Sequence, residues 1–315
     1  MEEKLDIIAI GESLIELSSD KKLCFAETLT KYYGGDALAT AIAALRAGSN
    51  VGFITRVGND VFKEFLMDSW QAEGLDISQV KISNDQNGVY FITRTSNREK
   101  EMSFYRRKTA PSKLSIEDIS EEYIENSKVV YASGTSLSLS MSAEEAVLKA
   151  FQIAKEKGIT TAFDPNFSLN FTTPEIAKEQ FAKVAPYIDI MFMSDKYDTT
   201  NILELESPEN IIKSLWDMGI GTVIIKSSQK CGYYTGYNGN IVFTEFYSKT
   251  SVDTTCAGDA FNGGYLHAIT HGYTPMEAVK LAGIVAGLQA QGIGAIKSIP
   301  YKDDIYSILR SSNND

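Results

Sequence analysis

Short apolar runs recur along the chain and alternate with longer segments that have helical periodicity. The runs lie at 7–10, 51–55, 129–132, 160–163, 188–193 and 222–225, and they are rich in β-branched and aromatic residues. They are too continuous for strands with one exposed face, so they are typical of strands buried on both faces. Because helical segments separate them, the pattern predicts an α/β fold with a mostly parallel central sheet and right-handed crossovers.

Cap residues mark where several of these helices begin. A Ser or Thr followed three residues later by Glu forms a capping box, and proline favours the first helical position. The signals are Ser142 with Glu145, Thr173 before Pro174, Ser207 before Pro208, and Thr274 with Pro275 and Glu277. They predict a helix start at each of these places.

One region departs from the strand–helix alternation. Segments 88–95 and 101–107 are strand-like and flank the polar turn 96–100, which predicts a hairpin. Segments 12–17 and 23–33 are candidates for further strands beside it. We interpret these pieces as a small β-sheet lid, formed by segments of about 12–34 and 86–108 and inserted in a single domain that spans 1–315.

The overall charge limits the partners of the chain. Its 315 residues carry a formal net charge of −11, which repels nucleic acid and anionic membranes but leaves room for a local basic pocket. No apolar run approaches membrane-spanning length, and no signal peptide is visible. Cys24, Cys231 and Cys256 are far apart, which argues against disulfides or a structural zinc site and predicts a cytoplasmic protein.

The segment 253–259, Asp-Thr-Thr-Cys-Ala-Gly-Asp, carries the clearest chemical signal. A turn of small residues opens a helix there, and Asp259 lies at the opening. Helix N-termini leave backbone N–H groups unpaired and carry partial positive charge, so they hold anions. A carboxylate does not improve anion binding, but it can accept a proton while negative charge develops beside it. The combination indicates phosphoryl transfer to a hydroxyl group.

Other common motifs are absent from the sequence. There is no GxxxxGK[ST] and no GxGxxG after the first predicted strand, which argues against a P-loop enzyme and against dinucleotide binding. HExxH is absent too. The only histidines, His267 and His271, are four apart and share a helix face, which could suit a metal. We interpret them instead as a helix surface and a partner of the helix dipole.

Taken together, these features resemble the PfkB family of carbohydrate kinases, and the likeness extends over nearly the whole chain. Near the N-terminus, Gly34-Gly35-Asp36-Ala37 leads into an alanine-rich helix, with segments 48–52 and 56–60 after it. Near the C-terminus stands the segment 253–259. The resemblance implies a ribokinase-like three-layer α/β sandwich with a small β-sheet lid, and ATP and Mg²⁺ as cofactors.

The resemblance also implies roles for the matching residues. Asp259 would be the catalytic base, and the amides of Cys256, Ala257 and Gly258 would form an anion hole for the phosphoryl group. The substrate would contact Gly34, Gly35 and Asp36. The nucleotide would border on Ser194, Lys226, Ser227, Ser228, Gly232 and Gly258. Asp253 and Thr255 would begin a monovalent-cation site, with K⁺ as the expected ion.

Within the family, the chain resembles the 2-keto-3-deoxygluconate kinase group. Segment 11–15 resembles that group's opening, and segment 103–115 resembles its Tyr-Arg element on the lid. By this resemblance Tyr105 and Arg107 would face an acidic sugar, with Tyr90 on the partner strand. A guanidinium can grip a carboxylate bidentately, although arginines on a lid can also be a solvated edge that discourages strand pairing.

The sequence departs from the family pattern at four positions. Ala39 replaces an Asn, Cys256 replaces a Gly at the start of the anion-hole turn, Ser168 replaces a second carboxylate-gripping Arg, and Tyr197 replaces a Glu that orders magnesium water. A small residue can replace the Gly if its φ is negative. Cys256 is interpreted as a packing substitution, with a reactive thiol as the alternative. Asp195 or Asp198 is the candidate substitute for the missing Glu.

The sequence therefore predicts an ATP-dependent kinase that phosphorylates a primary hydroxyl of a small sugar or sugar acid. 2-Keto-3-deoxygluconate is the expected substrate. The alternatives are a fructokinase, a 5-dehydro-2-deoxygluconokinase, and a sugar-binding sensor without catalytic activity. The lid residues Val89, Phe91, Ile92 and Phe104 are interpreted as apolar outer positions that would form a homodimer, or else cover the active site in a monomer.

Overall fold

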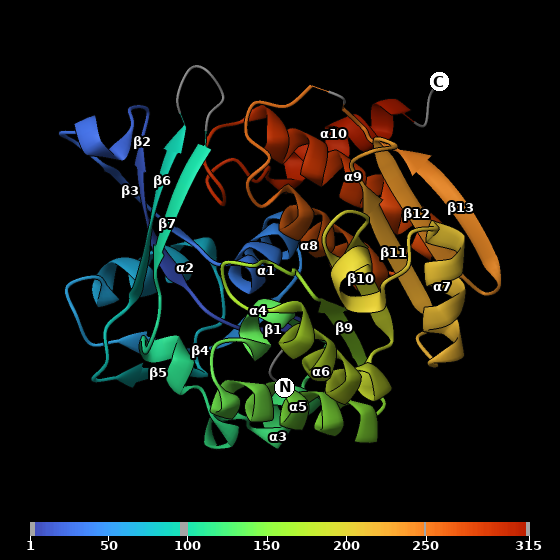
Figure 1. Ribbon diagram of the computed structural model, residues 1–315, viewed down its shortest axis with the longest axis horizontal. Helices are drawn as coiled ribbons and strands as arrows, with labels where there is room; N and C mark the ends of the chain where they lie inside the picture. Colours follow the sequence, from blue (N-terminus) through green and yellow to red (C-terminus); the bar gives the residue numbers. More distant parts are fainter. Residues whose placement is uncertain (1–3, 95–99, 249, 313–315) are drawn as a thin grey trace.

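The computed structural model describes residues 4–94, 100–248 and 250–312, and its core is a sheet of nine strands (Figure 1). The strand order is β13-β12-β11-β10-β9-β8-β1-β4-β5. The seven parallel strands are β1 (Leu5–Ile10), β4 (Val51–Gly58), β5 (Val80–Ser83), β8 (Ser127–Ser133), β9 (Thr160–Asp164), β10 (Ile190–Ser194) and β11 (Thr222–Ser227). Five of the six predicted runs lie within these strands and the run 188–193 overlaps β10, which confirms the mostly parallel sheet.

An antiparallel hairpin that the apolar runs did not predict extends one edge of the sheet. It consists of β12 (Gly232–Tyr237) and β13 (Asn240–Glu245), joined by a turn in which Asn238 and Gly239 both have positive φ. β13 is an edge strand whose residues are exposed or half-buried. Such a strand has no continuous apolar run, so the criterion that finds strands buried on both faces misses it.

Helices cover both faces of the sheet and give the structure three layers. Two separate apolar cores lie between the sheet and these helices. One core involves α1 (Asp36–Ala47), α2 (Lys63–Glu73), α8 (Ala257–Thr270), α9 (Pro275–Gln291) and α10 (Lys302–Ser312). The other involves α3 (Glu121–Glu125), α4 (Gly134–Leu137), α5 (Met141–Glu156), α6 (Pro174–Val184) and α7 (Pro208–Asp217).

The predicted helix starts are correct in most places. Thr173 and Thr274 cap α6 and α9 through their side chains, and Pro208 begins α7. The prediction for Ser142 was wrong, because Ser140 caps α5 by accepting a hydrogen bond from the Ala143 amide at 3.1 Å. Both serines precede the same apolar pattern, and only the backbone conformation decides which of them lies outside the helix.

A second sheet of four strands forms the predicted lid, at the upper left of Figure 1. Its order is β3 (Thr30–Gly34), β2 (Leu14–Ser19), β6 (Gly88–Arg94) and β7 (Lys100–Tyr105). One face carries its own apolar cluster of Leu14, Tyr90, Ile92 and Phe104. Most of the predicted turn 96–100 lies outside the described residues.

α1 and α8 pack against each other at very short range. A side chain at Gly263 of α8 would place its Cβ 2.3 Å from the Thr40 carbonyl oxygen and 2.6 Å from the Ala43 Cβ of α1. The alanine-rich sequence of α1 supplies the matching small surface. The backbones can approach this closely only because both surfaces lack large side chains, and the N-termini of the two helices are brought together as a result.

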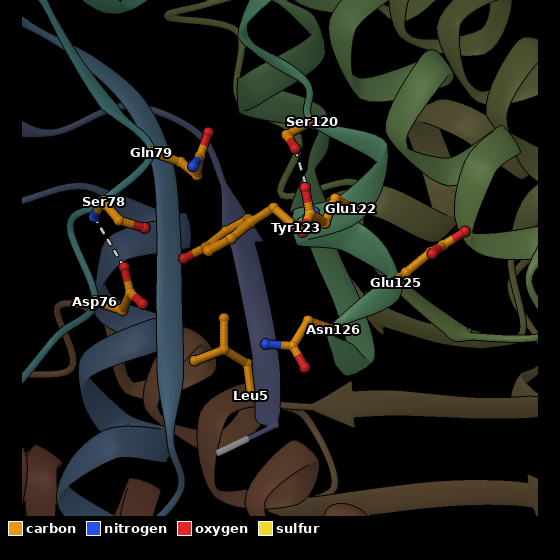
Figure 2. A pocket seen from close by; sticks show the side chains of 9 residues that line it. All are labelled: Leu5, Asp76, Ser78, Gln79, Ser120, Glu122, Tyr123, Glu125 and Asn126. Carbon is orange, nitrogen blue, oxygen red and sulfur yellow. Dashed lines mark hydrogen bonds between the residues drawn. The ribbon is translucent and has the colours of Figure 1, made fainter. Parts of the chain in front are cut away.

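A hollow of about 740 Å³ lies at the amino edge of the sheet, where β1 and β8 begin (Figure 2). Tyr123 of α3 extends across it, and a Cβ on Gly52 would approach the Tyr123 hydroxyl oxygen to 2.1 Å. Asp76, Glu122 and Glu125 give its wall an acidic character. Among the helices that the structure describes, none is long and apolar enough to span a membrane.

His267 is buried, contrary to the helix surface that its sequence suggested. Its Nδ1 lies 2.8 Å from the Ser49 hydroxyl, and its Nε2 lies 2.8 Å from the Tyr306 hydroxyl of α10. Burial, together with the nearby charge of His271, lowers the pKa of His267 to about 4. The ring therefore joins α8 to α10 and to the turn before β4 as a neutral group.

We predict that His267 makes folding sensitive to mild acid. Between its ordinary pKa of 6.5 and the folded value of about 4, the unfolded chain takes up a proton that the folded chain does not. Stability is therefore lost as pH falls through this window, by on the order of 3 kcal/mol. Urea unfolding of the His267→Gln variant at pH 7.5 and pH 5 should show a smaller pH dependence than the native chain. An equal slope in the variant and in the native chain would contradict the prediction.

Candidate active site

Polar residues that follow the parallel strands meet at the carboxyl edge of the sheet, where ligands of such sheets commonly bind. A cleft of about 380 Å³ opens there, between the ends of β9, β10 and β11 and the N-terminus of α8. Its lining includes Asp164, Asn166, Ser194, Asp195, Asp198, Lys226, Ser228, Thr254, Cys256, Gly258 and Asp259. Residues from widely separated parts of the chain thus form one cleft.

Asp259 and Asp36, from the first turns of α8 and α1, are bridged by one amide. The Asn166 Nδ2 donates to the Asp36 carboxylate at 3.0 Å and to the Asp259 Oδ1 at 3.3 Å. Asn166 has a φ of 42°, a left-handed conformation that asparagine tolerates better than most residues. This turn after β9 aims the amide at both carboxylates, so the two predicted signatures meet in space.

Asp259 is in an environment that favours its neutral form. Burial raises the pKa of Asp259 well above its ordinary value, and the nearby charges of Asp36 and Asp164 raise it further, against the opposing effect of Lys226. A carboxylate with a raised pKa is a stronger proton acceptor. The environment therefore suits the role of general base that the sequence predicted.

Lys226 places a positive charge beside the start of α8. Its Nζ donates to the Asp164 carboxylate at 2.5 Å and to the Asn262 Oδ1 at 3.2 Å. Asn262 in turn donates to Asp164 at 2.7 Å. A Cβ on Gly258 would lie 3.3 Å from the Lys226 Nζ, so the ammonium group lies beside the helix N-terminus. The network fixes Lys226 where an anion would bind.

The predicted anion hole differs from expectation in two respects. Cys256 has a φ of 64°, whereas the sequence argument required a negative value. This left-handed conformation favours glycine and strains any other residue. In addition, the Ala257 amide already donates to the Thr254 carbonyl at 3.2 Å, which closes the turn. The amides of Cys256 and Gly258 are therefore the remaining candidates for the predicted anion hole.

The two glycines before Asp36 allow close contacts between the lid and the cleft. A Cβ on Gly34 would lie 2.7 Å from the Tyr90 hydroxyl, and one on Gly35 would lie 2.4 Å from the Glu12 carbonyl oxygen. Tyr90 is buried, and its hydroxyl donates to the Glu16 carboxylate. The structure thus places Gly34, Gly35 and Tyr90 together at the base of the lid.

The orientation predicted for Tyr105 and Arg107 is corrected by the structure. Tyr105 is 66% exposed, and its ring meets Phe91 on the outer face of the lid, with centroids 5.6 Å apart. Arg107 is exposed as well. Arg107 lies in the turn that follows β7, so the strand alternation that orients Tyr105 does not orient it. Ile92 and Phe104, predicted as outer residues, lie instead on the inner face with Tyr90.

Arg106 is the lid arginine that points inward. Its guanidinium binds the Glu12 carboxylate with two contacts, at 2.6 and 3.1 Å, and lies 3.9 Å from the centroid of the Phe171 ring. Burial raises the pKa of Glu12 to about 7, while Arg106 opposes the shift. The Arg106 Nη1 is buried, and no described residue accepts a hydrogen bond from it. A bound ligand could provide that acceptor.

The residues predicted to border the nucleotide fall into two groups. Ser194, Lys226 and Ser228 line the cleft, and an adjoining apolar cavity of about 220 Å³ shares Lys226, Thr254, Phe246 and Gly258 with it. Ser227 is buried and donates to Asp195 at 2.5 Å. Gly232 is packed against β13, since its Cβ would lie 2.3 Å from Phe243. The structure explains Gly232 by sheet packing and not by the cleft.

Asp198 is held in place near the position of the missing Glu. Its carboxylate accepts hydrogen bonds from the Ser194 amide at 2.6 Å and from the Phe167 amide at 2.8 Å. Burial raises the pKa of Asp198 to about 6. Tyr197 is exposed, and a π-helical turn at Thr199–Leu203 follows. Such turns commonly accommodate one extra residue at functional sites.

Comparisons with known proteins agree with the fold. The family model described as pfkB family carbohydrate kinase matches residues 4–302. The chain therefore belongs to the PfkB family of carbohydrate kinases, and its α/β sandwich with a separate small sheet is ribokinase-like.

Individual relatives carry several sugar kinase names. A 5-dehydro-2-deoxygluconokinase of Clostridium beijerinckii is 27% identical over 322 residues, which cover 99% of this chain and 95% of the relative. A 2-dehydro-3-deoxygluconokinase of Thermoproteus tenax is 27% identical over 316 residues, with 98% and 96% covered. The solved structure of a fructokinase with bound ATP from Xylella fastidiosa has a TM-score of 0.86 at 20% identity, with 98% and 99% covered.

We predict that Cys256 is a poor nucleophile despite its position at a helix N-terminus. Burial raises the pKa of the Cys256 thiol well above its ordinary value, and Asp259 and Glu16 raise it further. The fully accessible Cys24 provides an internal comparison. Iodoacetamide labelling at pH 7.5, followed by mass spectrometry, should modify Cys24 at least about tenfold faster than Cys256. Faster labelling of Cys256 would restore the reactive-thiol interpretation.

Proposed function

We propose that the protein transfers the γ-phosphoryl group of ATP to a primary hydroxyl of a small sugar or sugar acid. The observation that carries the proposal is Asp259, a buried carboxylate with a raised pKa in the first turn of α8, beside Asp36 and Lys226. Family membership supports the reaction class. A sensor without catalytic activity would not need a proton acceptor beside an anion site.

The chemistry follows from the positions of these groups. Asp259 accepts the proton of the attacking hydroxyl, while Asn166 and Asp36 orient the substrate beside it. The amides of Cys256 and Gly258, together with Lys226, stabilise the negative charge of the transferring group. The lid and the Arg106–Glu12 pair cover the cleft and exclude water, which would otherwise accept the phosphoryl group.

The adjoining apolar cavity is a suitable place for the nucleotide base. Tyr233, Phe246 and Phe261 provide aromatic surface, and Gly283 and Gly287 of α9 keep one wall open. Because the cavity shares Lys226 and Gly258 with the cleft, a base bound there would direct its phosphates toward the start of α8. Free thiols at all three cysteines and the use of ATP support a cytoplasmic location.

A magnesium ion fits this site only as a companion of the nucleotide. The described residues contain no group of three or more acidic, His or Cys side chains that could hold a metal on their own. Mg²⁺ usually keeps several waters and binds through phosphates with one or two carboxylates. Asp195 and Asp198 are the carboxylates that would order its water shell. The bound ion would neutralise charge on the phosphates.

The substrate that we favour is a keto-deoxy sugar acid, 2-keto-3-deoxygluconate first and 5-dehydro-2-deoxygluconate second. The names of two relatives support this class. The buried Arg106 Nη1 is a charged donor in need of an acceptor, which a sugar carboxylate would supply. Ser168 provides no second guanidinium, so Arg106 is the main determinant of acid recognition. Fructose is the neutral alternative.

A homodimer through the lid also belongs to this proposal. The outer face of the lid presents Phe91 and Tyr105, of which Tyr105 is the more exposed, whereas Val89 is partly buried against the main core. A second lid could cover this apolar surface. Ile92 and Phe104 do not contribute to it, because Ile92 is buried and Phe104 partly buried on the inner face.

The Asp259→Asn variant tests the assignment of Asp259 as the catalytic base. The isosteric amide cannot accept the proton, so kcat should fall by roughly 10²- to 10⁴-fold while nucleotide affinity changes little. Coupled ADP assays and calorimetric ATP titration give the two values, with the exposed Asp303→Asn as control. A near-native kcat would remove the base assignment. Sugar binding by the native chain without any phosphoryl transfer would favour the sensor.

Arg106 should discriminate acidic from neutral substrates. In the double variant Glu12→Gln/Arg106→Gln, which avoids an unpaired buried charge, kcat/KM for a keto-deoxy sugar acid should fall roughly 10- to 150-fold, the loss of one charge-assisted contact. The value for fructose should change little. A substrate panel with ATP measures both, and the exposed Arg107→Gln is the matched control. Equal losses of kcat/KM for the acid in the double variant and in Arg107→Gln would contradict the assignment of Arg106 to acid recognition.

A further inference from the structure

One glutamine side chain contacts both the loop after α9 and the turn before α8. Gln289 lies in the last turns of α9 and is fully buried. Its Nε2 donates to the Thr255 carbonyl at 2.6 Å, to the Ser298 hydroxyl at 3.1 Å and to the Ala295 carbonyl at 3.3 Å. Three oxygens from two separate loops therefore converge on one amide nitrogen.

This convergence lies where the sequence predicted a monovalent-cation site. Asp253 accepts hydrogen bonds from the Thr255 amide at 3.0 Å and from the Gly294 amide at 3.2 Å. Backbone carbonyls, a hydroxyl and a nearby carboxylate are the oxygens that bind K⁺ well. The Gln289 amide occupies the point on which they converge, so K⁺ does not fit these residues unless that side chain moves.

We infer that the Gln289 carboxamide replaces a monovalent cation in this chain and makes its anion-hole turn independent of K⁺. A primary amide has two N–H groups and no acceptor on its nitrogen, so it satisfies converging oxygens as a small cation would. The three acceptors share these two donors. The expected effect on kcat rests on the proposed phosphoryl transfer. The expected effect on the melting temperature does not.

The contact with Thr255 gives Gln289 a direct influence on the cleft. The Thr255 carbonyl and the Cys256 amide belong to one planar trans peptide, so they point in opposite directions. By holding the Thr255 oxygen, Gln289 turns the Cys256 N–H away from itself, toward the side on which the predicted anion hole lies. Gln289 is therefore a positioning residue for that amide and does not itself touch the substrate.

The opposite orientation of the amide would require an ion. If Oε1 took the place of Nε2, it would face the Thr255 and Ala295 carbonyl oxygens and the Ser298 hydroxyl, which already donates to the Gly294 carbonyl, and a bound cation would compensate for the repulsion. In the present orientation Oε1 is buried without a hydrogen-bond partner among the described residues, a smaller penalty than an oxygen that faces two carbonyls. Dependence on K⁺ therefore distinguishes the two arrangements.

The test compares K⁺, Na⁺ and tetramethylammonium chlorides at equal ionic strength, with thermal melting and kcat as separate readouts. The native chain should melt within about 1 °C in all three salts and keep its kcat within about twofold. Gln289→Glu, which is isosteric but replaces the donor with an oxygen, and Gln289→Ala, which empties the site, should both become K⁺-dependent. We expect K⁺ to raise their melting temperature by several degrees and their kcat at least about tenfold.

Gln291→Ala is the matched control, because Gln291 is exposed at the end of the same helix. It should behave as the native chain does in every salt. The inference is overturned if K⁺ stabilises the native chain or raises its kcat severalfold, or if both Gln289 variants match the native chain in all three salts. Melting needs no substrate, so a native chain without transferase activity would refute the proposed function and leave the melting test of Gln289 intact.

Discussion

The close approach of α1 to α8 at Gly263 is the constraint on which the site depends. Both helices begin at the carboxyl edge of the sheet, and their first turns carry Asp36 and Asp259. With a larger residue at Gly263 the helices would separate, and the Asn166 amide could no longer reach both carboxylates. The packing of small residues in the core thus sets a distance between two functional groups that are far apart in the sequence.

Burying several carboxylates at one edge gives the cleft its chemistry. Arg106 is paired with Glu12, and Lys226 with Asp164, so neither cation is left to neutralise Asp259 fully. The result is a raised pKa at Asp259, caused first by burial and then by Asp36. The same excess of negative charge would repel a nucleotide, and the N-terminus of α8 and Lys226 are the local features that offset it.

The fold was largely predictable from the sequence, and the site only in part. Strands buried on both faces have continuous apolar runs, whereas β13 at the edge does not. The position of the cleft could be predicted from the segment 253–259, because its small residues and Asp259 mark the start of a helix. The inward arginine was missed because a motif gives positions and not the face of a strand. Phe104, two residues before Arg106, was itself predicted to lie on the outer face, so alternation could not have selected Arg106. Burial of His267 depends on α10, a contact that no local pattern encodes.

The role of Gln289 could not be predicted from the sequence. This residue also affects the electrostatics of the site. On α9 it looks like an ordinary polar residue near a helix end, and its role exists only where two loops bring three oxygens together. A cation in that place would bring a full positive charge close to the anion hole, while a neutral amide brings only a dipole. Stabilisation of the transferring group must then come from the start of α8 and from Lys226. This explains why the Lys226 ammonium is fixed by both Asp164 and Asn262 beside Gly258.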